Sequence, residues 1–173
     1  VKAIGEFLGQ SWSDSQVYEL VLNMEQIMST GGGWQDQVGG LTPGVKYITS
    51  RPGIRQKIHV TYLELDQDTK KELQERFVLI YTGQRRLARN LLREVVGNYI
   101  GGRRESIEAL KEMKRLAVLM RFELEQGNID AFAKLLNEHW EVSKLLDQGS
   151  TNTCIDQIFD CLLYTSDAAD DKA

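Results

Sequence analysis

A glycine-rich stretch over residues 30–40, Thr-Gly-Gly-Gly-Trp-Gln-Asp-Gln-Val-Gly-Gly, constrains the fold more than any other part of the chain. Five glycines fall within its last ten positions and surround one acidic residue, Asp36. Because glycine loses more conformational entropy on ordering than any other residue, such a cluster in a folded domain needs a reason. Positive φ angles and a close approach of the backbone to a ligand are two reasons. The composition fits equally a ligand-facing site and a tight loop in which Asp36 bonds its own backbone.

The overall composition is that of a globular domain and argues against several classes of protein. The chain has 173 residues, of which 42% are hydrophobic and 27% charged, and its net charge is −4. There is no basic character for nucleic-acid binding, and no apolar run reaches the roughly 18 residues that span a bilayer. Two cysteines give neither a disulfide framework nor a metal-ligand cluster, so we expect a reducing, cytoplasmic setting. No signal peptide opens the sequence, and a start without Met suggests a missing amino end.

The first half of the chain mixes helical and strand periodicity. Apolar spacing predicts helices over 1–9 and 14–28, the second of which begins with a capping-box pair, Ser13 and Gln16. Alternating apolar and polar residues then predict two strands, over 45–49 and 57–63, joined by turn residues.

The second half is helical except at its start. A short polar helix over 68–75 precedes a continuous apolar run at 77–81, which predicts a strand buried on both faces. Helical periodicity then continues to residue 159. It predicts four helices, over 84–96, 106–125, 129–146 and 153–159. These elements together predict an α+β fold.

Glu25 lies near the end of the predicted helix 14–28, eleven residues before Asp36. A carboxylate there opposes the negative end of the helix dipole unless a positive group, such as a metal ion, compensates. The ordinary alternative is a solvated side chain. One carboxylate at a helix end can bind Mg²⁺, and a second in a glycine-lined pocket can orient or deprotonate a hydroxyl. The two suit phosphoryl transfer from a nucleotide to an alcohol, although any acidic pair would support the same argument.

Three segments, residues 24–25, 33–37 and 81–83, resemble the middle of a GHMP sugar kinase. This superfamily contains galactokinase, homoserine kinase, mevalonate kinase and phosphomevalonate kinase. More narrowly, residues 31–40, with Gly-Ser-Thr-Asn-Thr-Cys at 149–154, are similar to the L-fucokinase part of bifunctional fucokinase/GDP-fucose pyrophosphorylases. The heptose-phosphate kinases are the next relatives.

The resemblance implies a fragment of a two-lobed kinase. Residues 1–74 would be the remainder of the N-terminal lobe with the catalytic Asp, and residues 75–160 a partial C-terminal lobe. The ATP-phosphate loop would precede Val1 and a late glycine motif would follow Phe159, so we expect the chain alone to be inactive. Residues 161–173 resemble one reading frame of the transposase adapter used in DNA sequencing libraries, and we expect them to be non-native.

The resemblance also implies residue roles. Asp36 would be the catalytic carboxylate that faces the sugar hydroxyl, and Glu25 the Mg²⁺ ligand. Trp34 would stack on the apolar face of the sugar, with a core or loop-anchoring aromatic as an equal alternative. The implied substrate-binding residues are Gly31, Gly32, Gly33, Trp34, Gln35 and Gln37.

The implied activity is ATP- and Mg²⁺-dependent phosphorylation of L-fucose to fucose 1-phosphate in nucleotide-sugar salvage. The partners would be the sugar and ATP, with a fused nucleotidyltransferase domain in the fucose branch and no nucleic acid or membrane. One alternative is a heptose-phosphate kinase. Another is a non-catalytic helical binding module, in which residues 84–160 do the work and the glycine stretch is a scaffold loop.

Overall fold

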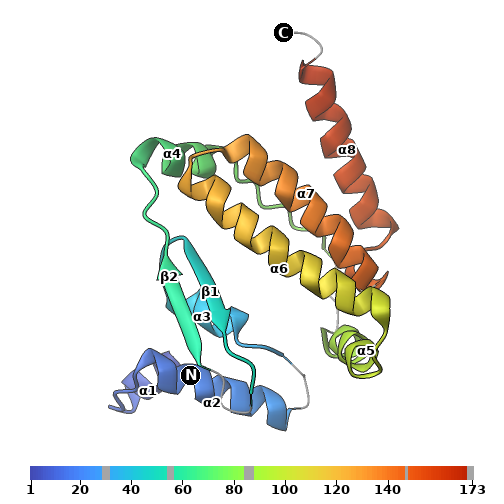
Figure 1. The fold of residues 1–173 in the computed structure, drawn as a ribbon. Coiled ribbons are helices and arrows are strands. Elements are labelled where there is room, and N and C mark those ends of the chain that lie inside the picture. Colours follow the sequence, from blue (N-terminus) through green and yellow to red (C-terminus); the bar gives the residue numbers. More distant parts are fainter. Residues whose placement is uncertain (29–31, 54–56, 84–87, 147, 171–173) are drawn as a thin grey trace.

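The computed structural model describes the chain except for residues 29–31, 54–56, 84–87, 147 and 171–173, and except for the side chains of 88–91, 148 and 163–170. Helices dominate the described part, and one small hairpin interrupts them (Figure 1). The elements of the first half are α1 (Lys2–Phe7), α2 (Asp14–Ile27), α3 (Gln35–Leu41), β1 (Lys46–Ser50), β2 (Ile58–Tyr62) and α4 (Gln67–Arg76). Those of the second half are α5 (Ala88–Ile100), α6 (Arg104–Glu125), α7 (Ile129–Leu146), the 3-10 turn η1 (Gln148–Ser150) and α8 (Thr153–Asp170).

The hairpin confirms the α+β class. Strands β1 and β2 are antiparallel, with Lys46 opposite Tyr62 and Ser50 opposite Ile58. In Figure 1 the hairpin lies between helices α1 and α2 and the long α6–α7 pair, and α3 lies behind it in this view. The hairpin therefore connects the part of the chain that carries the glycine stretch to the helical part.

The side chains expected to cap α2 do so. The Gln16 backbone N–H donates to Ser13 Oγ at 3.4 Å, and the Ser13 backbone N–H donates to Gln16 Oε1 at 2.8 Å. These two bonds satisfy donors that a helix start otherwise leaves unpaired. Asp66 caps α4 in a similar way, because its Oδ1 accepts from the Thr69 backbone N–H at 2.7 Å.

A buried cluster joins the hairpin to the helices. Leu63 and Leu65 follow β2 and pack with Leu124 of α6 and Ile129 of α7. Their side chains are between 4% and 7% exposed, so this is a true core. The Arg121 guanidinium also lies 5.2 Å from the ring centroid of Tyr47 in β1, within cation–π range. The α6–α7 pair is thereby fixed on the hairpin.

The strand predicted over residues 77–81 is wrong in this structure. The segment has no regular secondary structure, and Leu79 and Tyr81 are 91% and 85% exposed. In the part of the chain that the structure describes, β1 and β2 pair only with each other. An apolar run becomes a buried strand only when neighbouring strands pair with it and cover both of its faces.

The other predicted elements are present with shifted ends. Helix α5 continues to Ile100, and α8 continues to Asp170, well past the expected end at 159. The residues 84–87 at the expected start of α5 lie outside the described part. Among the described residues, no helix is both long enough and apolar enough to cross a membrane.

Candidate active site

The glycine stretch is only partly a loop. Residues 35–41 form helix α3, which includes Gly39 and Gly40, whereas the described residues before it, 32–34, lie in no helix or strand. Gly32, Gly33, Gly39 and Gly40 all lack a positive φ angle, and Gly31 lies outside the described residues. Positive φ angles therefore do not explain the described glycines, and space remains as an explanation for Gly32 and Gly33 alone.

Space is critical at Gly32. A Cβ built on this residue would lie 1.7 Å from Glu25 Oε2 and 2.9 Å from Glu25 Cδ. Glu25 stands two residues before the end of α2, and its side chain is partly buried. The absence of a side chain at Gly32 is therefore what lets the Glu25 carboxylate lie against the backbone of the glycine stretch.

The second oxygen of this carboxylate is held by Gln37. The Gln37 Nε2 donates to Glu25 Oε1 at 2.9 Å, across the junction between α3 and α2. The Gln37 side chain is only 7% exposed, and the adjacent Val38 is fully buried. Because a carboxylate only accepts hydrogen bonds, the donor end of the amide must face Glu25. The other end, Oε1, is buried and has no partner.

Asp36 differs from Gln37 in its surroundings. It lies in the first turn of α3 and is exposed. Successive helical residues point about 100° apart, so the residue next to a buried glutamine can face solvent. A carboxylate in a first turn is also favoured by the helix dipole. Asp36 is therefore open to a ligand, while Gln37 is engaged inside the protein.

The other predicted residues lie around the start of α3. Trp34 precedes the helix and is partly buried, whereas Gln35 is exposed. A Cβ on Gly33 would lie 2.2 Å from Gln35 Oε1, which is the end of a flexible side chain. The structure thus brings Glu25, Gly32 and Gln37 together and leaves Asp36 and Gln35 accessible.

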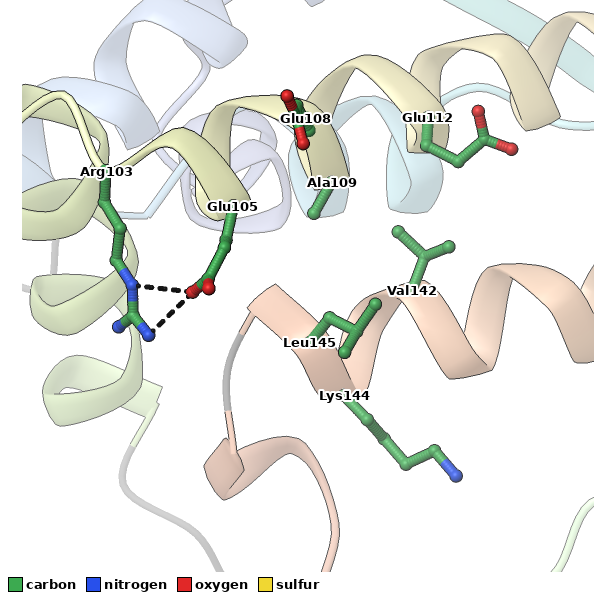
Figure 2. A pocket seen from close by; sticks show the side chains of 8 residues that line it. All are labelled: Arg103, Glu105, Glu108, Ala109, Glu112, Val142, Lys144 and Leu145. Carbon is green, nitrogen blue, oxygen red and sulfur yellow. Dashed lines mark hydrogen bonds and ion pairs between the residues drawn. The ribbon is translucent and has the colours of Figure 1, made fainter.

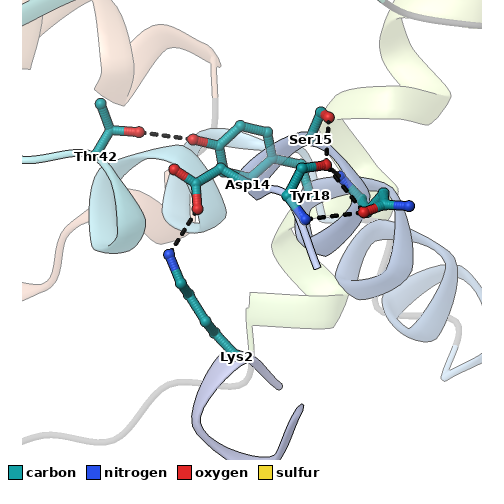
Figure 3. A network of polar contacts seen from close by, with 7 residues as sticks. Lys2, Asp14, Ser15, Tyr18 and Thr42 are labelled. Atoms are coloured by element: carbon teal, nitrogen blue, oxygen red, sulfur yellow. Dashed lines mark hydrogen bonds and ion pairs between the residues drawn. The ribbon is translucent and has the colours of Figure 1, made fainter. Parts of the chain in front are cut away.

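Helices α2 and α3 are also fastened at their other ends. Tyr18 of α2 and Thr42, which directly follows α3, share a hydrogen bond of 2.6 Å between their hydroxyl oxygens (Figure 3). The same view shows Lys2 bound to Asp14 at 2.7 Å, and this hydrogen bond raises the pKa of Lys2. Contacts at both ends limit how α3 can move relative to the helix that carries Glu25.

The described residues do not form a cage that could hold a metal ion by themselves. In the described ranges, no group of three or more His, Cys, Asp or Glu side chains gathers closely enough to hold a metal ion. Mg²⁺ usually takes one or two protein carboxylates and completes its shell with water and substrate phosphates. Glu25 offers one such carboxylate, already oriented by Gln37.

A separate pocket opens between α6 and α7 (Figure 2), and none of the predicted site residues lines it. Its lining includes Glu105, Glu108 and Glu112 from α6 and Val142, Lys144 and Leu145 from α7. The three carboxylates pair with arginines close by in sequence, namely Arg103 at 3.0 Å, Arg104 at 2.7 Å and Arg115 at 2.6 Å. Such charges are typical of a solvated helix face.

Known proteins match nearly the whole chain. It is 35% identical over 160 residues to a bifunctional fucokinase/GDP-fucose pyrophosphorylase of Arabidopsis thaliana. It is 33% identical over 160 residues to an L-fucokinase/L-fucose-1-P guanylyltransferase of Bacteroides fragilis. Over these 160 residues, the chain is similar to two proteins with fucokinase in their names. The resemblance inferred from the glycine stretch is thereby confirmed.

The alignments cover nearly all of this chain but only a small share of the fucokinase relatives. Each alignment covers 92% of this chain but only 15% and 17% of the two fucokinase relatives. A D-glycero-alpha-D-manno-heptose 7-phosphate kinase of Campylobacter jejuni is 23% identical over 160 residues, which are 92% of this chain and 46% of that protein. No protein-family model matches the chain. The chain thus corresponds to a minor part of each of these relatives.

Proposed function

We propose that this chain is part of a cytoplasmic, ATP- and Mg²⁺-dependent sugar kinase that converts L-fucose to fucose 1-phosphate. The proposal depends on one observation: the chain shares 35% and 33% sequence identity with two proteins that have fucokinase in their names. Residues 1–74 would complete one lobe and residues 75–160 part of a second. As in the two relatives, the whole protein would also carry a nucleotidyltransferase.

Each carboxylate has a distinct part in this proposal. Asp36 is exposed at the start of α3, where it can accept a hydrogen bond from the sugar hydroxyl and orient that oxygen toward the phosphoryl group. A loose phosphoryl transition state demands little early deprotonation, so orientation is its first role. Glu25 would hold Mg²⁺, which neutralises charge on the phosphates when bound.

The neighbours of Asp36 would contact the sugar. Trp34 offers an aromatic face that can stack on the apolar side of a sugar ring, and Gln35 offers an exposed amide. The glycines at 31–33 would let the backbone approach. ATP would bind to segments outside residues 1–173, so the chain expressed alone would neither bind ATP tightly nor phosphorylate fucose.

A chimera tests the proposal. The 160 aligned residues of this chain replace the matching segment of the Bacteroides fragilis protein, and fucose-dependent ATP consumption is measured. We expect fucose 1-phosphate from the chimera and a loss of about 10²–10⁴-fold in kcat after Asp36→Asn, the range for a general acid–base group. The unfolding temperature of the chimera, compared with that of its Asp36→Asn variant, serves as the folding control. A folded chimera in which Asp36→Asn leaves kinase turnover unchanged would contradict the assignment.

A heptose-phosphate kinase is the second candidate, because the Campylobacter jejuni relative aligns over the same share of this chain. Its name specifies a substrate that already carries a phosphate. The same chimera can be offered L-fucose and D-glycero-D-manno-heptose 7-phosphate in parallel. Higher kcat/KM for the heptose phosphate would favour this second candidate.

A further inference from the structure

We propose that Gln37 and Gly32 are positioning residues for Glu25, and that they set the orientation in which this carboxylate meets the metal. The inference rests on the proposed function, since it assigns a task to Glu25 in that reaction. The family resemblance, by contrast, implies that Gln37 and Gly32 contact the sugar.

The Gln37 side chain is held in a fixed place. Its side chain is 93% removed from solvent and stands beside Val38, which is fully buried. A glutamate side chain has several rotatable bonds, so near a helix end its carboxylate samples many positions unless a neighbour restrains it. The Nε2–H to Oε1 bond of 2.9 Å supplies that restraint from a rigid site.

The direction of the Gln37 amide is set by its contact with Glu25. Turning it over would place Oε1 against the Glu25 carboxylate, where two acceptors repel each other. The amide therefore stays with its donor toward Glu25, although this leaves the buried Oε1 without a partner. A buried acceptor without a partner is costly, so the orientation toward Glu25 must be the dominant interaction of this side chain.

The glycines of the stretch differ in how much room surrounds their Cβ positions. A Cβ on Gly39 or Gly40 would meet nothing within 4 Å, whereas a Cβ on Gly32 would overlap Glu25 Oε2 at 1.7 Å. Among the described glycines of the stretch, a Cβ is thus crowded at Gly32, by Glu25, and at Gly33, by the end of the Gln35 side chain. Gln37 restrains one oxygen of Glu25, and Gly32 leaves the room that the other oxygen occupies.

The first test needs no catalysis. Thermal unfolding of the 173-residue chain, repeated in the chimera, compares Gln37→Leu, Glu25→Ala and the double variant. We expect Gln37→Leu to lower the unfolding temperature when Glu25 is present and to be neutral or stabilising when it is absent, since residues in contact are not additive. Gln74→Leu, at an exposed position of α4, is the control and should be additive with Glu25→Ala. Additive effects of Gln37→Leu would overturn the pairing.

The second test separates positioning from sugar contact in the chimera. Loss of a partner that orients a metal ligand typically weakens metal affinity by about 10–100-fold. We therefore expect Gln37→Leu to raise the Mg²⁺ concentration for half-maximal activity by that factor, with the KM for fucose unchanged. A raised KM for fucose with unchanged Mg²⁺ dependence would overturn the inference. A chimera that phosphorylates no sugar would refute the proposed function, while the unfolding cycle would still decide the pairing.

Discussion

Replacing Gly32 with alanine should displace the Glu25 carboxylate while leaving the backbone in place. The new Cβ would stand 1.7 Å from Oε2, so that oxygen must retreat by about 1.5–2 Å to reach an ordinary contact distance. The retreat pulls Oε1 out of reach of Gln37 Nε2, which now lies at 2.9 Å. A hydrogen bond to a charged group contributes about 1.5–3 kcal/mol to stability, so we expect a loss of about 2 kcal/mol.

Two assays measure this change. A loss of about 2 kcal/mol in a chain of this length lowers the unfolding temperature by roughly 4–8 °C, which differential scanning fluorimetry resolves. In the chimera, a misplacement of the order of 1 Å can cost about 100-fold in turnover, so kcat should fall by about that factor.

The matched control is Gly39→Ala. Gly39 lies in α3 with open space around its Cβ position, and alanine has the better helix propensity, by about 1 kcal/mol. Gly39→Ala should therefore stabilise the chain or leave it unchanged. Adding Glu25→Ala should remove the penalty of Gly32→Ala, because the overlapping atoms are gone. If Gly32→Ala behaves like Gly39→Ala, or if Glu25→Ala does not suppress it, the reasoning is refuted.

Three further predictions concern residues outside this contact. Asp36→Asn should change the free energy of unfolding by no more than ordinary surface substitutions do, about ±0.5 kcal/mol, because Asp36 is exposed; a large loss of stability would instead assign it a structural role. Leu116→Ala in α6 should cost about 2–5 kcal/mol in chemical denaturation, because Leu116 is fully buried; a cost below 1 kcal/mol would contradict the described core. The Thr69 backbone N–H and hydroxyl lower the pKa of Asp66 from 3.8, so the stability that this carboxylate contributes is present above pH 3.8 and is lost as the pH falls through the lower pKa of the folded state. Asp66→Ala should therefore lower the unfolding temperature at pH 7, and the difference from wild type should shrink below pH 3.8; a difference that is the same at all pH values would be evidence against the cap.

Local signals in the sequence predicted local structure well. The Ser13–Gln16 pair marks the start of α2 because its bonds lie within four residues, and alternation predicts the hairpin because one face of each strand turns inward. The prediction of a buried strand at 77–81 failed because such a strand depends on partners that are distant in the sequence. An apolar run says nothing about whether partner strands exist, and this segment is exposed in the structure.

The contacts within the candidate site were not predictable from the sequence. Two glycines within seven residues lower helix propensity, so α3 was not expected, yet the burial of Gln37 and Val38 offsets that deficit. The bond between Gln37 and Glu25 joins residues twelve positions apart on different helices. No periodicity or motif signals such a pair, because it depends on how α2 and α3 pack.

The most direct test of the account is a crystal structure of the chimera with fucose, a non-hydrolysable ATP analogue and Mn²⁺ in place of Mg²⁺. Anomalous scattering locates the metal independently of the protein coordinates. The account predicts a metal bound to Glu25, Gln37 still donating to that carboxylate, and Asp36 within hydrogen-bond distance of the fucose 1-hydroxyl. A metal held elsewhere, or a sugar bound away from Asp36, would contradict it.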